Sequence, residues 1–575
     1  MSERRIGAYI CYCGGNISDY VDVEKVREAV SDEPGVIIAK TTMFACSDAA
    51  QQEMIDDIKK ENLDGLVVAS CSPKLHLFTF KGTAGRADLN PYQYVQVNLR
   101  EQVSWAHTDD RVGATDKAIR LVRAGIAKAG LTEPLEPIRI DTVPQALVIG
   151  AGIAGMRAAI GLADLGIHVF LVERSPELGG WIGKLEEIYP YGEKGSELIA
   201  KLVAEVTERD NIAVFTEAQM VEKSGCVGNF EVKIEIKGRD RISLNVGTII
   251  VATGFDSYMP KEGEFGLGME GVLTLPEFRE LLDSANGRLT YDGKEVRSIT
   301  YIYCVGSMQK SDVEDPHFYC SRYCCSAAAH TSLLAGDQAA SLRQYHLFRD
   351  MRTYGKFESL YTQARDRGAI FVKFNPDEPP SVERKDGGLR VTVKDLLTAG
   401  EQVELDSDLV VLVTGMVPRK NERLVDALKL PQSIDGFFNE IHPKLRPVET
   451  VIDGVLIAGT CQGPKTSSES VASALAAVAK AAPIMMKGYV ELAPLIAAVD
   501  PERCEWCGLC NQACPYNALD RVHYNGKEIA AVNEALCKGC GACVPICPQD
   551  ALDVKGYTDA QMRAMIQVLA KEVAQ

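Results

Sequence analysis

Residues 146–175 read ALVIGAGIAGMRAAIGLADLGIHVFLVERS, and this stretch sets the architecture of the middle of the chain. It predicts a strand, a glycine-rich turn, a helix and a second strand that ends at the acid Glu173. Gly150 permits the tight turn, Gly152 lets a pyrophosphate approach the backbone, and Gly155 lets helix and strand pack closely. The free N–H groups of the helix N-terminus favour an anion there. The stretch therefore predicts a Rossmann-type dinucleotide site with Glu173 on the ribose; a glycine-rich packing turn is the alternative.

Segments further along the chain indicate FAD rather than NAD. ELGGWIGK at 177–184, IIVATGF at 249–255 and GVLIAGTCQGPKTSSESVASA at 454–474 resemble the flavin-contacting segments of thioredoxin-reductase-like flavoproteins. VLVTGMVP at 411–418 echoes the second of these segments. The resemblance implies a flavin domain of that type.

The last of these segments departs from the family pattern. Thioredoxin-reductase-like proteins usually carry Gly-Asp there, whereas this chain has Gly459 and Thr460, so the acid that usually holds the ribityl chain is missing. Lys465 and the serines between 467 and 470 are candidates to face the isoalloxazine ring, although a helix N-cap explains the serines equally well. The candidate FAD-binding residues are Gly150, Gly152, Ile153, Ala154, Gly155, Glu173, Arg174, Gly180, Trp181, Ala252, Thr253, Gly254, Gly459, Thr460 and Lys465.

A cysteine phrase with the spacing Cys-x2-Cys-x2-Cys-x3-Cys-Pro occurs twice near the end of the chain. In such a phrase three thiolates bind one [4Fe–4S] cluster and the fourth binds the other cluster. A zinc ribbon is the alternative, but it needs two cysteine pairs rather than triplets with a distal Cys-Pro. The first cluster is expected on Cys504, Cys507, Cys510 and Cys547, and the second on Cys537, Cys540, Cys543 and Cys514.

More cysteines stand where a second nucleotide site is expected. Flavoproteins of this shape normally bind NAD(P)H in a second Rossmann unit, but the corresponding stretch, SITYIYCVGSMQ at 298–309, lacks the glycine fingerprint. HFYCSRYCCSAAA at 317–329 contains no Cys-x-x-Cys dithiol, which argues against thioredoxin-type disulfide chemistry. A further [4Fe–4S] cluster is the preferred interpretation, and buried free cysteines are the alternative. Its candidate ligands are Cys304, Cys320, Cys324 and Cys325.

These features together resemble the A subunit of heterodisulfide reductases over essentially the whole chain. The resemblance rests on YCSRYCC, the GPK segment, the terminal cysteine phrases, and an N-terminal region with CYCGGNIS, ACS, VVASCSP, LNPYQY and NLREQVSWAH. One departure is that longer members carry an additional inserted ferredoxin domain, for which this chain has no cysteines. The resemblance favours one more [4Fe–4S] cluster near the N-terminus, with incidental thiols or a zinc site as alternatives. Its candidate ligands are Cys11, Cys13, Cys46 and Cys71.

The same resemblance implies an activity. An electron pair from a hydrogenase- or formate-dehydrogenase-linked donor would be split by flavin-based bifurcation between a disulfide-reducing partner (CoM-S-S-CoB in methanogens) and ferredoxin. A homodimer within a larger complex of heterodisulfide reductase-type subunits is implied as well. No catalytic residue is assigned beyond the FAD itself, because the cofactor performs the chemistry. Rival interpretations are a pyridine-nucleotide oxidoreductase and a non-bifurcating subunit of a benzoyl-CoA reductase, a methylene-tetrahydrofolate reductase or a quinone-linked complex.

Length and composition suit a multidomain α/β protein. The chain has 575 residues and a net charge of −17, which argues against a nucleic-acid surface. The N-terminus lacks an apolar signal core, and the apolar stretch 471–486 contains Lys480 and Pro483, so a cytoplasmic protein without a transmembrane segment is expected. Amphipathic stretches at 23–30 and 51–60, and a helix at 114–129, are expected near the N-terminus. The predicted parts are an N-terminal α/β domain (1–135), a Rossmann-type FAD domain of the thioredoxin-reductase kind with an inserted portion (136–490), and a two-cluster ferredoxin domain with a C-terminal helix (491–575).

Overall fold

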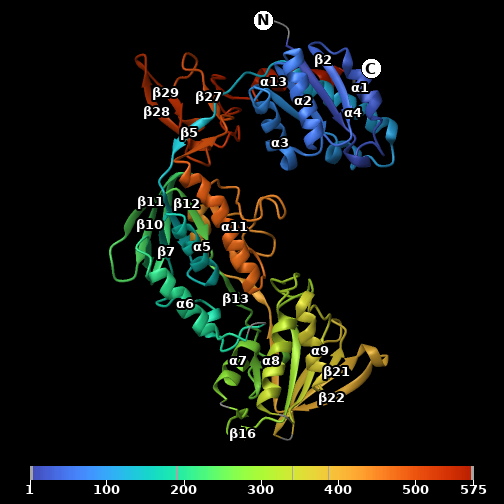
Figure 1. Cartoon of the computed structure of the whole chain (residues 1–575), viewed down its shortest axis with the longest axis vertical. Coiled ribbons are helices and arrows are strands. Elements are labelled where there is room, and N and C mark those ends of the chain that lie inside the picture. Colours follow the sequence, from blue (N-terminus) through green and yellow to red (C-terminus); the bar gives the residue numbers. More distant parts are fainter. Residues whose placement is uncertain (1–3, 190–191, 286, 340, 386, 572–575) are drawn as a thin grey trace. The chain divides into compact units, whose positions relative to one another are not determined.

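The computed structural model describes residues 4–189, 192–285, 287–339, 341–385 and 387–571 (Figure 1). Two compact units are present. One is formed by the residues up to Arg139 together with those from Glu491 onward, and the other is Ile140–Val490. The chain passes between the units at β5 (Ile138–Asp141) and β26 (Tyr489–Leu492).

A parallel sheet forms the N-terminal half of the first unit. Its strand order is β2-β1-β3-β4, and β1 and β3 are buried along their whole length, as parallel strands covered on both faces require. Asp22, Ser47 and Asp110 cap helices α1, α2 and α4 by accepting hydrogen bonds from backbone N–H groups. The strands are β1 (Ile6–Cys11), β2 (Val36–Thr42), β3 (Gly65–Ser70) and β4 (Tyr94–Asn98), and the helices are α1 (Val23–Ser31), α2 (Asp48–Glu61), α3 (Pro73–Arg86) and α4 (Arg111–Ala129).

The C-terminal half of this unit consists of two short antiparallel strand pairs, a short helix and a final helix. The amide of Gln561 on the final helix donates to the carbonyl oxygen of Leu131 at 2.9 Å, and the ammonium of Lys128 lies 3.5 Å from the ring centre of Tyr557. These contacts attach the last helix to the end of α4. The elements are β27 (Ala497–Val499) with β30 (Leu552–Val554), β28 (Leu519–Tyr524) with β29 (Lys527–Val532), α12 (Leu509–Ala513) and α13 (Asp559–Lys571).

The second unit contains two sheets with the same design. The first has the order β25-β12-β6-β7-β8 and the second has the order β14-β23-β17-β18-β19, all of them parallel. In each sheet the central strand leads through a helix to its neighbour on one side, and a three-stranded antiparallel sheet directly precedes its neighbour on the other side, β12 or β23. The second sheet is therefore a structural repeat of the first, although the sequence shows no such repeat.

The elements of the first sheet are β6 (Gln145–Ile149), β7 (His168–Val172), β8 (Ile212–Phe215), β12 (Thr248–Val251) and β25 (Val455–Ile457), with helices α5 (Ile153–Asp164), α6 (Gly195–Thr207) and α11 (Ser467–Met486) and the small sheet β9 (Ala218–Cys226), β10 (Asn229–Ile236) and β11 (Ile242–Val246). The elements of the second sheet are β14 (Val272–Thr274), β17 (Ser298–Val305), β18 (Arg343–Phe348), β19 (Ile370–Lys373) and β23 (Leu409–Thr414), with helices α7 (Leu275–Ser284), α8 (Cys324–Gln338) and α9 (Glu358–Asp366) and the small sheet β20 (Ser381–Lys385), β21 (Gly388–Asp395) and β22 (Glu401–Ser407). An antiparallel pair, β13 (Phe255–Ser257) with β24 (Met416–Pro418), connects the two sheets.

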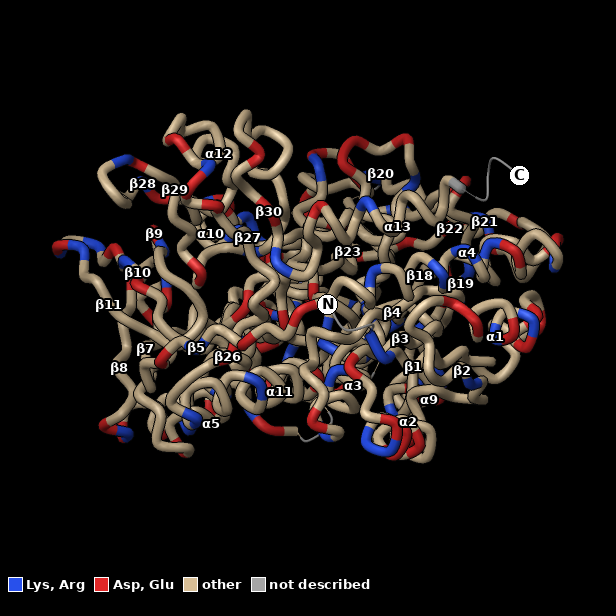
Figure 2. Tube along the Cα trace, turned by 90° about the horizontal axis from the view of Figure 1, so that it is seen from above, with Lys and Arg blue, Asp and Glu red and all other residues tan. Residues whose placement is uncertain are grey.

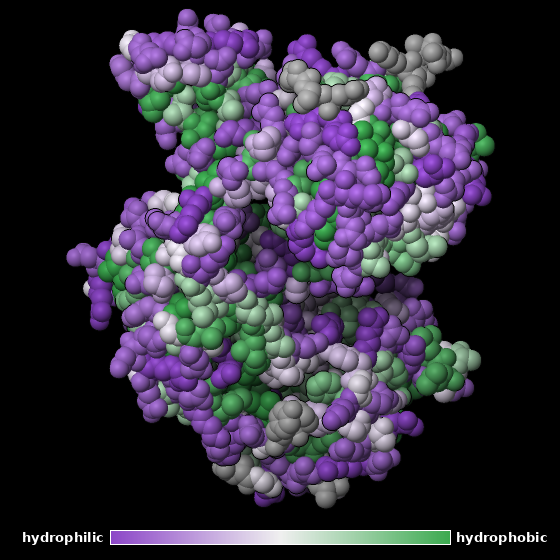
Figure 3. All heavy atoms as spheres, turned by 45° about the horizontal axis from the view of Figure 1, so that its top comes forward, coloured by the Kyte–Doolittle hydropathy of each residue, from purple (hydrophilic) through white to green (hydrophobic). Residues whose placement is uncertain are grey.

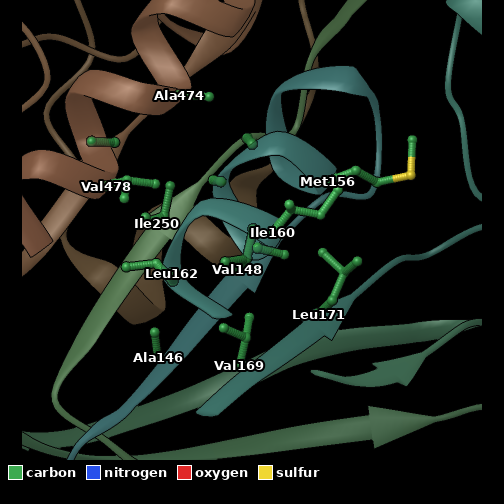
Figure 4. Packing of buried hydrophobic residues seen from close by; sticks show 14 of the residues in the cluster. Ala146, Val148, Met156, Ile160, Leu162, Val169, Leu171, Ile250, Ala474 and Val478 are labelled. Carbon is green, nitrogen blue, oxygen red and sulfur yellow. The ribbon is translucent and has the colours of Figure 1, made fainter. Parts of the chain in front are cut away.

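Helix α11 belongs to the core of the first sheet. Among the described residues it is the one helix whose length and apolar composition would allow a membrane span. Its residues Ala474 and Val478 lie in the same buried cluster as Ile250 of β12 and Leu162 of α5 (Figure 4). One face of α11 therefore packs into the core of this sheet.

The surface is that of an ordinary α/β protein. Acidic and basic residues are interspersed along the trace, for instance on α2 and on the β28–β29 hairpin (Figure 2). Hydrophilic residues cover most of the face drawn in Figure 3, with hydrophobic ones in patches between them. The expected α/β fold is confirmed, with a parallel sheet near the N-terminus and two Rossmann-type parallel sheets in the middle of the chain.

Candidate functional site

The glycine turn between β6 and α5 has the backbone that a pyrophosphate requires. Gly150 has φ +102°, and a Cβ on it would collide with the carbonyl oxygen of Ala252. A Cβ on Gly155 would collide with the carbonyl oxygen of Gly150. Gly152 caps α5, and no atom of the described residues lies within 4 Å of where its Cβ would stand. The first and third glycines therefore serve packing, and the second leaves room for an anion at the helix N-terminus.

The acid expected to bind ribose lies beside this turn. Glu173 follows β7, and its carboxylate accepts hydrogen bonds from the backbone N–H of Ala151 at 2.7 Å and of Ser175 at 2.9 Å. The neighbouring Arg174 is exposed. Glu173 thus stands at the edge where a dinucleotide would lie, and its role toward ribose remains a prediction.

The expected flavin-contacting segment 177–184 crosses the glycine turn. The N–H of Gly179 donates to the carbonyl oxygen of Ala151 at 2.9 Å, and Gly180 adopts φ +59° next to Gly152. Trp181 stacks on the ring of Phe255, with 5.7 Å between ring centres, and donates from Nε1 to the Phe255 carbonyl oxygen at 3.3 Å. The segment 177–184 therefore joins the glycine turn to the end of the segment 249–255.

Arg419, a cation that sequence reasoning missed, fixes the backbone of the segment 249–255. Arg419 donates to the carbonyl oxygens of Thr253 at 2.9 Å and Phe255 at 2.8 Å, and pairs with Asp256 at 2.8 Å. Gly254 between them has φ +78°. Arg419 directly follows the VLVTGMVP segment, which the sequence singled out without giving the arginine a role.

The closing segment lies over the first turn of α5. Gly459 has φ +75°, and a Cβ on it would lie 2.8 Å from Cβ of Ala154. Thr460 follows in a short 3-10 helix. Lys465 donates to Gln462 Oε1 at 3.1 Å, and burial lowers the pKa of its ammonium. The closing segment, the glycine turn and the Thr253–Gly254 strand end thus meet at one edge of the sheet.

The loop after β17 departs from this plan and carries the first cysteine of the inserted quartet. Cys304 lies near the end of β17 with φ +61°, a left-handed conformation that non-glycine residues rarely adopt. Arg349 holds the loop by donating to the carbonyl oxygens of Cys304, Ser307 and Met308 at 3.3, 3.1 and 2.5 Å. The loop is therefore pinned in a strained form, as is common at functional sites.

The other three cysteines of this quartet lie at the start of α8. The N–H of Arg322 donates to Cys320 Sγ at 3.3 Å, while Cys324 and Cys325 begin the helix and are buried. Electrostatic interactions link these thiols to one another and to Cys304. Burial raises the pKa of Cys325 to about 12 and also raises the pKa of Cys324. Grouped thiols of this kind become thiolates only when a metal centre replaces their protons, so this donor set fits an iron–sulfur cluster.

The N-terminal quartet gathers at the carboxyl edge of the first unit's sheet. Cys11 ends β1, Cys13 follows it, Cys46 lies in the loop after β2, and Cys71 follows β3. The N–H groups of Cys13 and of Ala45 both donate to Cys11 Sγ at 3.3 Å. Electrostatic interactions link Cys11 to Cys13 and Cys46, and Cys71 to Cys11 and Cys13. The four cysteines, spread over 61 positions of sequence, thus lie at the same edge of one sheet.

A second cation that sequence reasoning missed lies against this quartet. Arg100 donates from Nη1 to Cys13 Sγ at 3.8 Å. Burial raises the pKa of Cys71 to about 11, and the charge of Arg100 opposes that rise. Arg100 Nε is buried without a hydrogen-bond partner among the described residues. An unused donor on a cation beside the thiols of Cys13 and Cys71 fits an anionic iron–sulfur centre.

The eight C-terminal cysteines are arranged as two equivalent halves. The N–H of Ala518 donates to Cys514 Sγ and that of Ala551 to Cys547 Sγ, both at 3.3 Å. Cys504 and Cys537 accept from the N–H groups of Ala530 and Ala497, both at 3.4 Å. A pocket is lined by Cys514 of the first phrase together with three cysteines of the second, Cys537, Cys540 and Cys543. These four are the set that the crosswise pairing assigns to one cluster. Among the described residues no three His, Cys, Asp or Glu side chains are grouped closely enough to hold a single metal ion.

Models of two protein families match the chain. A 4Fe-4S dicluster domain matches residues 497–554, and the pyridine nucleotide-disulphide oxidoreductase family matches residues 144–294. The first match covers both cysteine phrases and the second begins one residue before β6, the strand that leads into the glycine turn.

Three relatives match almost the whole chain. The iron-sulfur A subunit 2 of CoB--CoM heterodisulfide reductase from Methanopyrus kandleri is 36% identical, over 91% of this chain and 92% of its own length. The A subunit of the H(2):CoB-CoM heterodisulfide,ferredoxin reductase from Methanothermobacter thermautotrophicus is 36% identical, over 90% and 91%. The A subunit of the H(2)/formate:CoB-CoM heterodisulfide,ferredoxin reductase from Methanococcus maripaludis is 32% identical, over 92% of each. Among solved structures, thioredoxin reductase of T. acidophilum aligns with a TM-score of 0.40 at 16% identity, covering 60% of this chain and 99% of its own.

Proposed function

This chain belongs to the family of heterodisulfide reductase A subunits, and on that premise we propose that it divides electron pairs between two acceptors within a larger complex. Family membership and the two matched domains make the chain an oxidoreductase component, a flavoprotein and a [4Fe–4S] protein. One proposed acceptor is a disulfide-reducing partner subunit and the other is ferredoxin.

The difference between the two repeated sheets carries this proposal. β6 leads into α5 through a short glycine turn, whereas β17 leads into α8 through an 18-residue loop, 306–323. The loop has no glycine fingerprint, and its strand and helix ends bring four buried or half-buried cysteines together. The glycine-rich turn that usually binds a nicotinamide dinucleotide's phosphates is absent from this edge, and ligands for a one-electron centre occupy the corresponding position. This arrangement favours electrons entering or leaving the flavin one at a time.

The donor sets are assigned from these contacts. FAD would lie across the glycine turn, the Trp181 segment, the Thr253–Gly254 strand end and the closing segment. The inserted quartet would hold one [4Fe–4S] cluster, the N-terminal quartet another, and the crosswise C-terminal sets two more. When bound, FAD exchanges two electrons and each cluster exchanges one, which allows a two-to-one conversion.

The chain's own groups adjust this chemistry by hydrogen bonding and charge. Backbone N–H groups donate to Cys514, Cys547, Cys504 and Cys537, and such bonds to sulfur raise the potential of a cluster. Arg100 places a positive charge beside the N-terminal thiols, which acts in the same direction. Arg349 instead binds backbone carbonyls and fixes the loop of the inserted quartet. The protein therefore has separate means of tuning each centre.

Partners are proposed from the relatives' names. Those names include H2, formate, ferredoxin and the CoB–CoM heterodisulfide. We therefore propose a hydrogenase- or formate-dehydrogenase-linked donor subunit, heterodisulfide reductase-type partner subunits and ferredoxin. A homodimer within a cytoplasmic complex is proposed from the family resemblance and not from these names.

The proposal is tested on the native complex purified without oxygen. Partner chains are identified, the complex is supplied with its electron donor, and reduction of ferredoxin is followed with and without the disulfide acceptor. Splitting of electron pairs predicts that ferredoxin is reduced only while the disulfide is reduced, with one electron to each branch. Disulfide reduction without any linked ferredoxin reduction would instead establish a non-bifurcating subunit. Bleaching of the isolated chain's flavin by NADH would restore the nicotinamide interpretation.

A further inference from the structure

Arg322 stands between two cysteines of the inserted quartet, yet its side chain leads away from the thiols. Its backbone has φ +60°, and its N–H donates to Cys320 Sγ at 3.3 Å. Its guanidinium donates to Glu469 Oε1 at 2.6 Å and to the hydroxyl of Tyr354 at 3.0 Å. A further bond runs to the carbonyl oxygen of Pro464 at 3.3 Å. The residue thus reaches from the cysteine loop to the flavin-closing segment, 147 positions along the chain.

The acid that receives Arg322 belongs to the N-terminus of α11. Glu469 Oε2 accepts from the N–H of Thr466 at 2.9 Å, and the two residues form a capping box. Partial burial would raise the pKa of Glu469, but the N–H of Thr466 and the guanidinium of Arg322 outweigh it and hold the pKa below its usual value. Glu469 is therefore an anion in the same turn as Lys465, at the helix end that faces the proposed flavin position.

Stability alone does not account for this ion pair. Both side chains are part-exposed, 45% for Arg322 and 36% for Glu469, and pairs at such positions add little to folding stability. A left-handed backbone at a non-glycine residue adds strain. The arrangement is better explained by what it connects, which is the loop of one redox centre and the helix end beside another.

We propose that Arg322 is a positioning residue that couples the inserted cluster site to the flavin, by holding the Cys320–Cys324 loop against α11 and by neutralising Glu469 beside the flavin. This inference rests on the proposed function, because it takes FAD to lie at the closing segment and a [4Fe–4S] cluster to lie on the quartet. It assigns a role to the one residue of the Cys-x3-Cys-Cys run whose side chain forms an ion pair across to α11.

Charge gives the pair a signature that a structural role does not share. Reduction adds negative charge to the flavin, so a nearby unpaired anion makes reduction harder and a nearby unpaired cation makes it easier. Arg322→Gln leaves Glu469 unpaired and is expected to lower the midpoint potential of the flavin. Glu469→Gln leaves Arg322 unpaired and is expected to raise it, while Gln keeps the capping box. The double variant restores neutrality and is expected to lie close to the wild type.

The experiment is a spectroelectrochemical titration of the flavin in the full-length chain under nitrogen, with FAD content measured for each variant. Arg322→Lys keeps the charge and should recover most of the potential lost in R322Q. Arg384 of β20 and Glu270, which precedes β14, form an ion pair of similar exposure at 2.5 Å and supply the control variants R384Q and E270Q, which should leave the flavin potential unchanged.

Shifts of opposite sign in R322Q and E469Q, with recovery in the double variant, support the inference. Shifts of the same sign, or no shift in either, overturn it while leaving the proposed function intact. Absence of FAD from the wild-type chain contradicts the proposed function itself. If R322Q cannot be purified with FAD, a rise of the potential in E469Q still supports the inference, and its absence overturns it.

Discussion

Nη2 of Arg349 lies 3.3 Å from the carbonyl oxygen of Cys304, and the same nitrogen lies 3.1 Å from the carbonyl oxygen of Ser307. These bonds hold a loop in which Cys304 and Met308 both have positive φ. One cation thus fixes the backbone that presents the first thiol of the inserted quartet.

Replacing this cation is expected to empty the inserted cluster site. In Arg349→Gln the loop loses its charged donor, a change of about 2 kcal/mol in local stability, and Cys304 no longer holds its place. Iron in the purified chain should fall by about four atoms per FAD, the content of one cluster. Arg343→Gln, an exposed position at the start of β18, the strand that Arg349 directly follows, is the control and should keep all its iron. Full iron content in R349Q would contradict the assignment of this loop.

The glycine turn predicts two distinct results from two alanine variants. Gly152→Ala places a methyl group in open space, so the unfolding free energy of the flavin-free chain should stay within about 0.5 kcal/mol of the wild type. FAD occupancy should nevertheless fall, because the methyl group intrudes on the pyrophosphate. Gly155→Ala collides with the carbonyl oxygen of Gly150 and should destabilise the chain itself by about 1–3 kcal/mol. Chemical denaturation and FAD titration distinguish these cases; full FAD binding by G152A would rule out this position for the pyrophosphate.

The crosswise pairing of the C-terminal cysteines is testable by two double variants. If Cys514 serves the same cluster as Cys540, then C514A/C540A loses one cluster, or about four irons. C507A/C514A then removes one ligand from each of the two clusters and is expected to lose about eight irons. Pairing within each phrase predicts the reverse order. Iron analysis of the two purified proteins decides between them, with Cys226→Ala as a cysteine control outside the predicted sites.

A buried histidine predicts a pH dependence of stability. His346 is stacked between Tyr301 and Phe371, bonds to the hydroxyl of Tyr303, and has a pKa lowered to about 3 by burial, against an ordinary value of 6.5. Below pH 6.5 the imidazole of His346 is protonated in the unfolded state but stays neutral in the folded state. The free energy of unfolding that this group contributes is therefore present above pH 6.5 and is lost as the pH falls toward 3. Between pH 6.5 and 5.5 the loss should be about 1 kcal/mol. Thermal unfolding at these two pH values should show a smaller drop in H346Q, and an equal drop would contradict the prediction.

Local sequence patterns predicted those helices and turns that depend on residues only a few positions away. The stretch at 51–60 is part of α2, which starts earlier, at Asp48, because Ser47 accepts from the N–H of Ala50. The helix at 114–129 likewise begins at Arg111, after the cap Asp110. Both capping residues were visible in the sequence, so these errors were avoidable. The packing roles of Gly150 and Gly155 were predictable because both glycines meet backbone atoms within the same unit, whereas Gly152 faces open space and its role toward a pyrophosphate stays a prediction.

Residues that act across the fold were not predictable from one sequence. Arg349 reaches Cys304 across 45 positions, and Arg419 reaches Thr253 across 166. An arginine has no local signature for such contacts, since they depend on which strands become neighbours. A second Rossmann unit was expected at 298–309 from the resemblance, but the sequence alone does not show the likeness of the two sheets. The second sheet has a cysteine loop in place of the glycine fingerprint, which is the one feature that would have revealed the likeness.

The most direct test of the account is to count iron and FAD in the full-length chain purified under nitrogen, as the wild type and as Cys324→Ala. Four clusters and one flavin predict about sixteen irons per FAD, falling to about twelve in C324A with FAD retained. About eight irons per FAD in the wild type, with no change in C324A, would leave only the C-terminal clusters and contradict the claim that a one-electron centre stands where a nicotinamide would bind.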